Sequence, residues 1–566
     1  MINLNFKNYY VIFLGLGISL FFAFNNFEKE ATISLLVLLV LIAFSYKFIF
    51  QTTEQIEYKL KNKRILGFTF LFLFCFSFIS QNVFLNFETI DWDVASYLVA
   101  SQDINNGNLP NQEQWESKGP FLFYLYNLIS LFSFKNLVIF RLINDLIIFV
   151  ISFVLYLSVL NLKKYDYTRA FFTSVFFLLL MSQGWAVSEY SETFSLLFLS
   201  ISFYLITKLE INYKIIFFIG FLLSLSTLIN QGTFLFVLPY VFFIFKNFKN
   251  KKLINISQFF VLGLSLPHIF SLIIYASNGL LDIYLTTYVE IPLGYIKANY
   301  ASFYELRVFL REFFDYIDDL FFAFISLSIF LLINLLNRSI SFIKLFSDLK
   351  YLNILASLLF YFIGSHNYYH HLIFFLYFMT FLLVDLKFNT QTLFIYTFIT
   401  ISLFSFLQGN IQKSIYNLTN INKIYNEYPL KQLSSEIDSY FDEEYSILAL
   451  DYVLVLYYLE KENYTYIIHP TNHFEEFIVT TLSDIGKIEK DYISNILLNE
   501  NPDVILCTQR MIIRGTPTMN PLYNCEVSDY RKDYIKLDTK KYETNPNLNY
   551  YLDPYKEVKV FIRKEN

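Results

Sequence analysis

Apolar segments long enough to cross a lipid bilayer recur along most of the chain, and they constrain its fold more than any other feature. Only 16% of the 566 residues are charged, whereas soluble proteins carry about 25%. A membrane-spanning helix needs roughly 20 mainly apolar residues. Segments that meet or approach this length are residues 9–25, 31–50, 65–83, 137–160, 170–187, 190–207, 214–230, 232–246, 253–275, 318–336, 351–365, 369–386 and 391–408. The sequence therefore predicts an α-helical, multi-spanning membrane protein with about 13 transmembrane helices.

The basic residues indicate which ends of these helices face the cytoplasm. Lysines and arginines gather in alternate connections, which are residues 51–64, 161–169, 208–213, 247–252, 337–350 and the short link at 387. Outer connections such as residues 25–30 and 185–189 are poor in both. By the positive-inside rule the N-terminus then lies in the cytoplasm. The loops 84–118 and 276–317 and the tail after residue 410 are consequently predicted on the outer face.

The composition suggests which membrane this is. Abundant Phe, Ile, Asn, Lys and Tyr are typical of an AT-rich bacterial genome. We therefore predict a multi-pass protein of a bacterial inner membrane, with the outer loops and the tail in the periplasm. ATP and nucleotide sugars are absent there, so a transferase on this side must take its donor from a lipid carrier.

The chain is predicted to divide into a membrane part, residues 1–410, and a soluble tail, residues 411–566. The tail has β-like runs at residues 445–450, 464–468 and 503–507, with a helical pattern at 485–498. Alternating strands and helices predict a small α/β domain in the periplasm. Cys507 and Cys525 can form a disulfide there, because that compartment is oxidising. We expect this domain to cover the active site or to hold the acceptor.

Outer loop 84–118 carries the acidic residues on which the functional prediction depends. A helical pattern begins at Asp93 and is ended by Gly107, so residues 92–106 are predicted to form one short helix. Asp91 then lies at the N-cap and Asp93 in the first turn, where the helix dipole stabilises carboxylates. Capping alone explains both residues. Alternatively, one carboxylate takes a proton from an acceptor hydroxyl while the other orients it or helps to hold a metal.

Lys118 is predicted at the edge of the bilayer, because an apolar run at residues 121–134 follows it closely. An ammonium group at this depth can meet a lipid phosphate and offset its charge. The simpler interpretation is a lysine that extends its charge to the interface and binds nothing.

The order of acid, helix, glycine, proline, second acid and lysine resembles the first outer loop of the GT-C membrane glycosyltransferases, which use polyprenyl-phosphate sugars. These include protein O-mannosyltransferases, the aminoarabinose transferases that act on lipid A, and family-39-like bacterial enzymes. The resemblance implies a GT-C fold for the membrane part. It rests on Asp93 with Tyr97, Gly107 with Pro110, and Glu116 with Lys118 and Pro120.

The loop also departs from the family pattern. Val94 follows Asp93 where the family often has a second acid, and Asp91 lies two residues upstream instead. Gly119 stands where the family has a proline. These departures leave open whether Asp91 or Asp93 is the base.

Further polar residues near the outer face are candidates for the same site. Arg141 can help Lys118 to hold the donor phosphate, or it can anchor its helix at the interface. Substrate contacts are expected from Tyr97, Glu116, Glu189, Gln231, His366, Tyr369 and His370. Nothing in the sequence requires a cofactor, and a divalent metal ion held by Glu116 and His268 is an open option.

The sequence thus predicts a membrane glycosyltransferase that moves a sugar from a polyprenyl-phosphate carrier to an acceptor hydroxyl. A single displacement with Asp93 or Asp91 as base implies inversion. The expected partners are the lipid-linked donor, the bilayer and an acceptor glycan, lipid or protein, without nucleic acid. A transporter or lipid flippase is an alternative, although the acids concentrate in outer loops and no paired half-sequences are visible. A non-catalytic scaffold and a polysaccharide polymerase or ligase also stay open.

Overall fold

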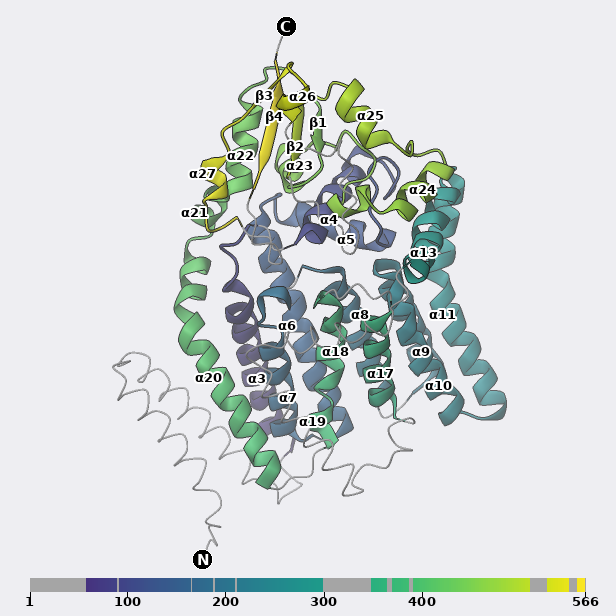
Figure 1. The fold of residues 1–566 in the computed structure, drawn as a ribbon. Coiled ribbons are helices and arrows are strands. Elements are labelled where there is room, and N and C mark those ends of the chain that lie inside the picture. The colour runs from purple at the N-terminus through teal and green to yellow at the C-terminus, as the bar shows by residue number, and fades with distance from the viewer. Residues whose placement is uncertain are drawn as a thin grey trace, which may run out of the picture.

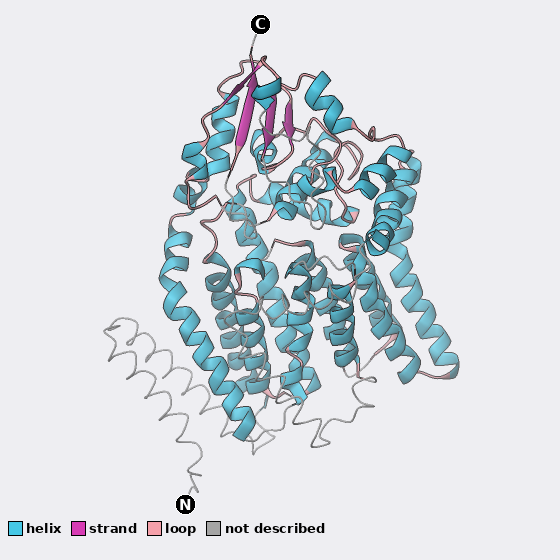
Figure 2. Ribbon diagram, viewed as in Figure 1, coloured by secondary structure: helices cyan, strands magenta, loops and turns pink. Residues whose placement is uncertain are grey.

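A computed structural model describes residues 58–88, 91–163, 165–186, 189–208, 211–298, 348–363, 369–385, 390–508, 527–548 and 557–564. The predicted spans at residues 9–25, 31–50 and 318–336 lie outside these ranges. A bundle of helices forms most of the molecule, and a small sheet with short helices lies at one end of it (Figures 1 and 2).

The apolar segments predicted within the described ranges are helical. They form α3 (Tyr58–Asn82), α6 (Leu137–Leu162), α7 (Tyr167–Leu180), α8 (Ser191–Ile206), α9 (Tyr213–Ile229), η4 (Gln231–Phe236) with α10 (Val237–Asn247), α11 (Asn250–Ser277), α17 (Leu349–Phe362), α18 (Leu372–Met379) with α19 (Leu382–Asp385), and α20 (Thr390–Thr419). Within the described residues, 3 helices can cross a membrane by length and composition: residues 64–82 of α3, α6 and α11. Six shorter apolar helices have 10–17 residues, and three predicted spans lie outside the described ranges, so the total of about 13 spans stays a prediction.

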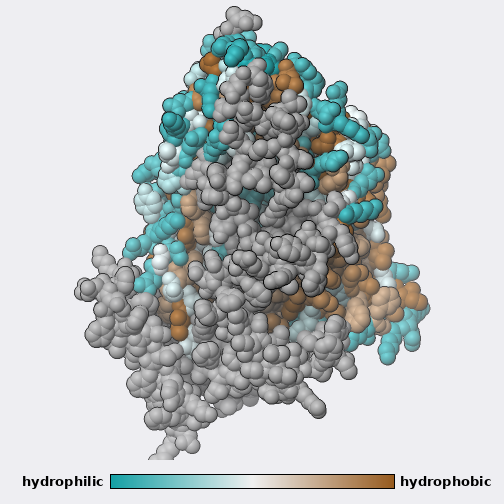
Figure 3. Space-filling view, viewed as in Figure 1, coloured by the Kyte–Doolittle hydropathy of each residue, from teal (hydrophilic) through white to brown (hydrophobic). Residues whose placement is uncertain are grey.

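The outward surface of α11 has the character of a lipid-facing helix. Leu262, Phe270 and Ile273 are 53%, 65% and 60% exposed. Figure 3 shows hydrophobic side chains gathered at the lower right, where Figure 1 places α10 and α11. Apolar side chains exposed in a contiguous group are stable where lipid tails cover them.

The predicted helix at residues 92–106 is confirmed as α4 (Trp92–Gln102), which continues into the 3-10 turn η2 (Asp103–Asn106). Asp91 is its N-cap, and the backbone N–H of Asp93 donates to Asp91 Oδ1 at 3.2 Å. Gly107 follows with φ +87°, a left-handed conformation that glycine adopts without strain. The apolar run after Lys118 forms α5 (Pro120–Phe132).

The C-terminal residues contain a four-stranded sheet in the order β1-β2-β4-β3. Its strands are β1 (Ile447–Ala449), β2 (Val504–Cys507), β3 (Tyr534–Lys536) and β4 (Lys559–Arg563). β1 pairs parallel with β2, whereas β4 runs antiparallel to β2 and β3. The helices of this region are α21 (Ile421–Asn426), α22 (Pro429–Asp438), α23 (Leu454–Leu459), η7 (Pro470–His473), α24 (Glu476–Asp484), α25 (Tyr492–Asn499), α26 (Val527–Tyr530) and α27 (Lys540–Glu543).

Two of the three predicted strands in the tail are confirmed as β1 and β2. The third, at 464–468, forms no strand and contains an isolated bridge, between Ile467 and Trp115 of the outer loop. The N–H of Trp115 donates to the Tyr466 carbonyl at 2.6 Å, and the N–H of Ile468 donates to the Trp115 carbonyl at 3.2 Å. The tail and the acidic loop therefore lie against each other at one end of the bundle.

A carboxylate from the outer loop also caps a helix of the tail. Glu88 is buried and accepts the N–H of Leu430 at 2.6 Å and that of Lys431 at 3.0 Å, which lie in the first turn of α22. These donors have no partner within the helix. Helix α20 leads into this region without a break at residue 410, because it continues to Thr419.

We expect Glu88→Ala to loosen the tail from the membrane part. The substitution leaves two N–H groups of α22 without an acceptor, one of them buried, which costs about 1–2 kcal/mol. Limited trypsin digestion in detergent should cut the tail several-fold faster. Glu443→Ala changes an exposed glutamate in the same region and is the control. Equal digestion rates in both variants would mean that Glu88 does not hold the tail.

Candidate active site

The N-terminus of α4 places two aspartates side by side, each with its own set of partners. Asp91 is buried, and both of its oxygens accept hydrogen bonds, Oδ1 from the N–H of Asp93 and Oδ2 from the Tyr190 hydroxyl at 2.9 Å. Asp93 lies within the first turn and stays partly exposed, with 20% of its side chain accessible. Of the two, Asp93 is the carboxylate that a substrate can reach.

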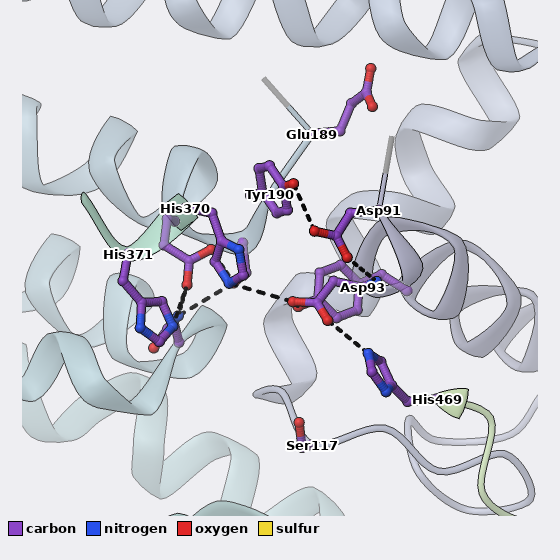
Figure 4. Close-up of polar contacts among 12 residues, drawn as sticks. Asp91, Asp93, Ser117, Glu189, Tyr190, His370, His371 and His469 are labelled. Atoms are coloured by element: carbon purple, nitrogen blue, oxygen red, sulfur yellow. Dashed lines mark hydrogen bonds and ion pairs between the residues drawn. The ribbon is translucent and has the colours of Figure 1, made fainter. Parts of the chain in front are cut away.

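Three side chains from different parts of the chain surround Asp93 (Figure 4). Tyr97, one helical turn on, donates its hydroxyl to Oδ2 at 3.0 Å. His469 from the tail places Nε2 2.7 Å from Oδ1. His370, from η6 (Tyr369–His371), places its Nε2 3.5 Å from Oδ2 on the opposite side. The membrane part and the tail thus meet at this carboxylate.

These surroundings shift the pKa values of the two aspartates in opposite directions. Burial, together with the charge of Asp93, raises the pKa of Asp91 to about 7. Burial alone would also raise the pKa of Asp93, but the hydrogen bond and charge of His469 hold it well below its ordinary value. Asp93 is therefore ionised at any physiological pH, whereas Asp91 titrates near neutrality.

His469 is held so that its ring faces Asp93. The backbone N–H of Thr471 donates to its Nδ1 at 3.3 Å, which leaves the proton of the neutral ring on Nε2, toward Asp93. The Thr471 hydroxyl lies 3.0 Å from Nδ1 and can accept a hydrogen bond from it when the ring is charged. Burial lowers the pKa of His469, but the bond to Asp93 outweighs it, and the net shift is upward.

Lys118 reaches the same space from the segment before α5. Its ammonium lies 5.9 Å from the centre of the Tyr97 ring, and no described residue hydrogen-bonds it. Burial lowers its pKa, yet the nearby carboxylates of Glu192, Asp93 and Glu116 raise it overall, so it is charged. Lys118 is a cation without a hydrogen-bonded anion.

Gly119 is required for this placement. Its N–H donates to the Ile229 carbonyl at 3.1 Å, and a Cβ atom built on it would lie 2.1 Å from the Leu228 carbonyl oxygen. Only a glycine lets the chain pass the end of α9 this closely. Glycine in place of the proline of the family pattern therefore has a packing reason here.

Glu116 is buried beside Lys118 and has one oxygen without a partner. Ser117 donates its N–H and hydroxyl to Oε1 at 2.7 and 2.8 Å. Oε2 is buried and has no hydrogen-bond partner among the described residues. Burial raises the pKa of this carboxyl. A buried carboxylate oxygen that has no hydrogen-bond donor in the protein is suited to accept a hydrogen bond from a ligand.

Arg141 and Glu189 lie in a pair of their own. Arg141 Nε is 2.5 Å from Glu189 Oε1, both side chains are buried, and Arg141 also donates to the Phe87 carbonyl at 2.5 Å. Figure 4 shows Glu189 directed away from Asp91 and Asp93. The phosphate contact predicted for Arg141 and the sugar contact predicted for Glu189 find no support in this geometry, because each side chain is occupied by the other.

The remaining predicted residues take different positions. Gln231 donates to the Ser117 carbonyl at 3.0 Å and so borders the segment that carries Lys118. His268 Nε2 contacts the Thr227 hydroxyl at 2.9 Å, and no contact joins it to Glu116 in the described part of the chain. His366 lies outside the described residues, and of Tyr369 only the backbone is described.

Four residues that contribute to the site are absent from the substrate contacts expected from the sequence: His469, Tyr190, Glu192 and His371. Tyr190 and Glu192 lie within three residues of the predicted Glu189, but which of these side chains point inward depends on where α8 begins. His371 adjoins the predicted His370. A signal for His469 existed, since a His-Pro pair directly follows the predicted strand 464–468.

The chain was compared with known proteins. No protein-family model and no curated protein sequence matches it. Among solved structures, the crystal structure of ArnT from Cupriavidus metallidurans in the apo state is similar, with a TM-score of 0.52 and 10% sequence identity. The likeness covers 79% of this chain and 93% of that chain. At this identity the likeness concerns the fold, and the chain has an ArnT-like GT-C fold, as the outer-loop motif predicted.

Proposed function

We propose that this protein is a membrane glycosyltransferase that moves a sugar from a polyprenyl-phosphate carrier to an acceptor hydroxyl at the outer face of a bacterial inner membrane. The observation that carries the proposal is Asp93, an accessible carboxylate in an ArnT-like fold whose pKa is held well below its ordinary value, with Lys118 nearby, a cation that no described residue hydrogen-bonds. A base and a phosphate-binding cation in one site are what a transfer from a phosphate-linked sugar needs.

In the proposed reaction the acceptor hydroxyl attacks the anomeric carbon from the side of Asp93. The new bond from the acceptor oxygen to the sugar forms as the bond to the phosphate oxygen breaks. The electron pair leaves with the polyprenyl phosphate, and the hydroxyl proton passes to Asp93. One displacement inverts the anomeric centre. Lys118 would stabilise the charge on the departing phosphate.

A carboxylate of low pKa is a weak base in the ground state, but it suffices here. A hydroxyl becomes strongly acidic once its oxygen bonds to the anomeric carbon, so a weak base can accept its proton at that moment. The fixed negative charge also stabilises the positive charge that develops on the sugar ring. We therefore assign the base to Asp93, and to Asp91 the positioning of α4.

The placement of the tail is consistent with a periplasmic site. The loop that holds Asp93 and the described part of the second outer loop both contact the tail, the latter through Tyr295, which donates to Asn472 at 3.2 Å. Cys507 is disulfide-bonded, as expected in an oxidising compartment, whereas Cys75 is free. His469 is supplied by the tail, which supports the expectation that the tail covers the site.

The proposal is tested with purified protein in detergent, radiolabelled polyprenyl-phosphate sugars and a membrane extract as acceptor. Label transfer that requires the lipid-linked donor and releases polyprenyl phosphate would support it. Stoichiometric transport into sealed vesicles without bond cleavage would contradict it and favour a transporter. A ladder of extended glycans would indicate a polymerase.

Lys118→Ala should lower kcat/KM for the donor about tenfold, because a charge-assisted hydrogen bond to phosphate contributes about 1.5 kcal/mol or more. The loss should appear mainly in KM for the donor. Lys135→Ala is the control, since this lysine pairs with Glu460 in an exposed salt bridge at the same end of the molecule. An unchanged donor KM in Lys118→Ala would remove this residue from the phosphate site.

A further inference from the structure

A second group of polar side chains borders the aspartates and is not used by the proposed transfer. Glu192 lies in the first turn of α8 and is fully buried. It accepts from Asn230 Nδ2 at 2.8 Å and from the Ser191 hydroxyl at 3.0 Å. Among the described residues, no lysine or arginine nitrogen lies within ion-pair distance of it. Lys118 is close enough for the charge of Glu192 to raise its pKa, but it is shared with other carboxylates. A buried carboxylate that lacks an ion pair of its own is costly, so the site favours a further cation.

Two imidazoles complete this group. His371 Nε2 lies 3.5 Å from Glu192 Oε1. His370 joins them, and one potential ligand atom from each of the three residues falls within 4.8 Å of the others. Ligand atoms bound at about 2.0–2.1 Å to one tetrahedral Zn²⁺ are about 3.4 Å apart. The His371–Glu192 pair already has this separation, and the third atom needs only a small side-chain shift.

Neighbouring residues orient these three side chains. The His370 ring stacks on Tyr190 with centres 4.5 Å apart, and the His371 ring meets the edge of Phe360 at 4.9 Å. Asn230 and Ser191 fix the Glu192 carboxylate. Metal sites typically have such an outer layer, which sets the direction of each ligand.

The charge balance of the site gives a reason for an ion here. Asp93, Glu116 and Glu192 surround one lysine, Lys118, and a phosphate brings further negative charge into a space of low dielectric. His370 links the group to the base, since its Nε2 is 3.5 Å from Asp93 Oδ2. A cation bound beside His370 would be close enough to offset this charge.

We infer that Glu192, His370 and His371 bind a divalent cation of borderline softness, such as Zn²⁺. Two imidazoles and one carboxylate are a donor set that such ions prefer, and it leaves coordination positions for a ligand oxygen. The ion would meet the phosphate of the lipid-linked donor, and to that extent the inference deepens the proposed function. This three-residue site replaces the metal site predicted from Glu116 and His268, which the structure does not bring into contact.

Metal content tests the inference without any transfer assay. The full chain is purified in detergent, stripped with EDTA, dialysed against a buffered Zn²⁺ solution and analysed by mass spectrometry of the metal. The wild type should hold about one zinc ion per chain. At the same free Zn²⁺, Glu192→Gln and His371→Asn should hold less than about a tenth of that amount, and Asn230→Ala should bind about tenfold more weakly. His268→Asn is the matched control and should keep the full amount.

Each outcome decides the matter. A wild type without zinc, or cluster variants that retain it, would overturn the inference, and loss of zinc in His268→Asn alone would return the site to the pair predicted from sequence. If Glu192→Gln does not fold, the absorption of the Co²⁺-loaded wild type and of His371→Asn serves instead, because the tetrahedral bands should vanish in the variant. Zinc binding with transfer unaffected by EDTA would refute contact with the phosphate and leave the proposed function standing. Absence of transfer with zinc bound would refute the function alone.

Discussion

Replacement of Asp93 by asparagine should reduce sugar transfer about 1,000-fold, because the variant has no base for the acceptor proton. Asparagine has the shape of aspartate, and its amide oxygen can still accept a hydrogen bond from Tyr97 or His469. The fold and donor binding should therefore change little. The loss should appear in kcat, measured as initial transfer of label with saturating donor, while thermal unfolding in detergent stays near that of the wild type.

Asp91→Asn is the matched comparison. Asn is as good an N-cap as Asp, so α4 should persist with the amide oxygen in the place of Oδ1. The amide NH₂ then takes the place of Oδ2 and can donate to the Tyr190 hydroxyl, which accepts instead of donating. We expect a loss of about tenfold, since the variant alters only the packing and charge beside the base. If Asp91→Asn lost transfer and Asp93→Asn kept it, the assignment of the base would be reversed. Equal activity of all three proteins would rule out a carboxylate base at α4.

The local structure around these aspartates follows directly from the sequence. Capping preference and helical spacing predicted the helix at 92–106, the cap at Asp91 and the end at Gly107, because all three depend on interactions within a few residues. The apolar segments could be predicted equally well, because the apolar character of each segment lies in its own side chains. The same reasoning failed to find β3 and β4, which are short and are stabilised by pairing with distant strands.

Contacts between distant segments could not be predicted. Arg141 was expected to be free for phosphate, yet a carboxylate 48 residues away neutralises it. Asp93 and His469 are 376 residues apart, and nothing in either segment indicates the other. The choice between Asp91 and Asp93 depends on such contacts, because Tyr190 occupies one carboxylate and His469 sets the acidity of the other. Sequence motifs therefore located the site, and only the folded chain assigns roles within it.

In His469→Ala the rate of sugar transfer should fall at acidic pH, whereas in the wild type it should not. In the wild type the pKa of Asp93 is held far below neutrality, chiefly by His469 against the effect of burial, so acidification does not protonate the base. Without His469, the effect of burial is opposed only by the charges of His370 and Lys118, so the pKa of Asp93 rises. Its ionised fraction then falls about tenfold for each pH unit below that pKa, so transfer by the variant should fall on acidification from about pH 8 to about pH 5, while transfer by the wild type should not.

The recovery at high pH separates this effect from simple damage to the tail. A disrupted fold would lower transfer at every pH, whereas a base that only lacks its partner regains activity once it is ionised. His473→Ala is the control, because this buried histidine of the same turn bonds to Tyr492 at 2.6 Å instead of to Asp93. Its pH profile should keep the shape of the wild type. A His469→Ala profile parallel to that of the wild type would show that the tail contributes nothing to the ionisation of Asp93, and the link between tail and base would have to be abandoned.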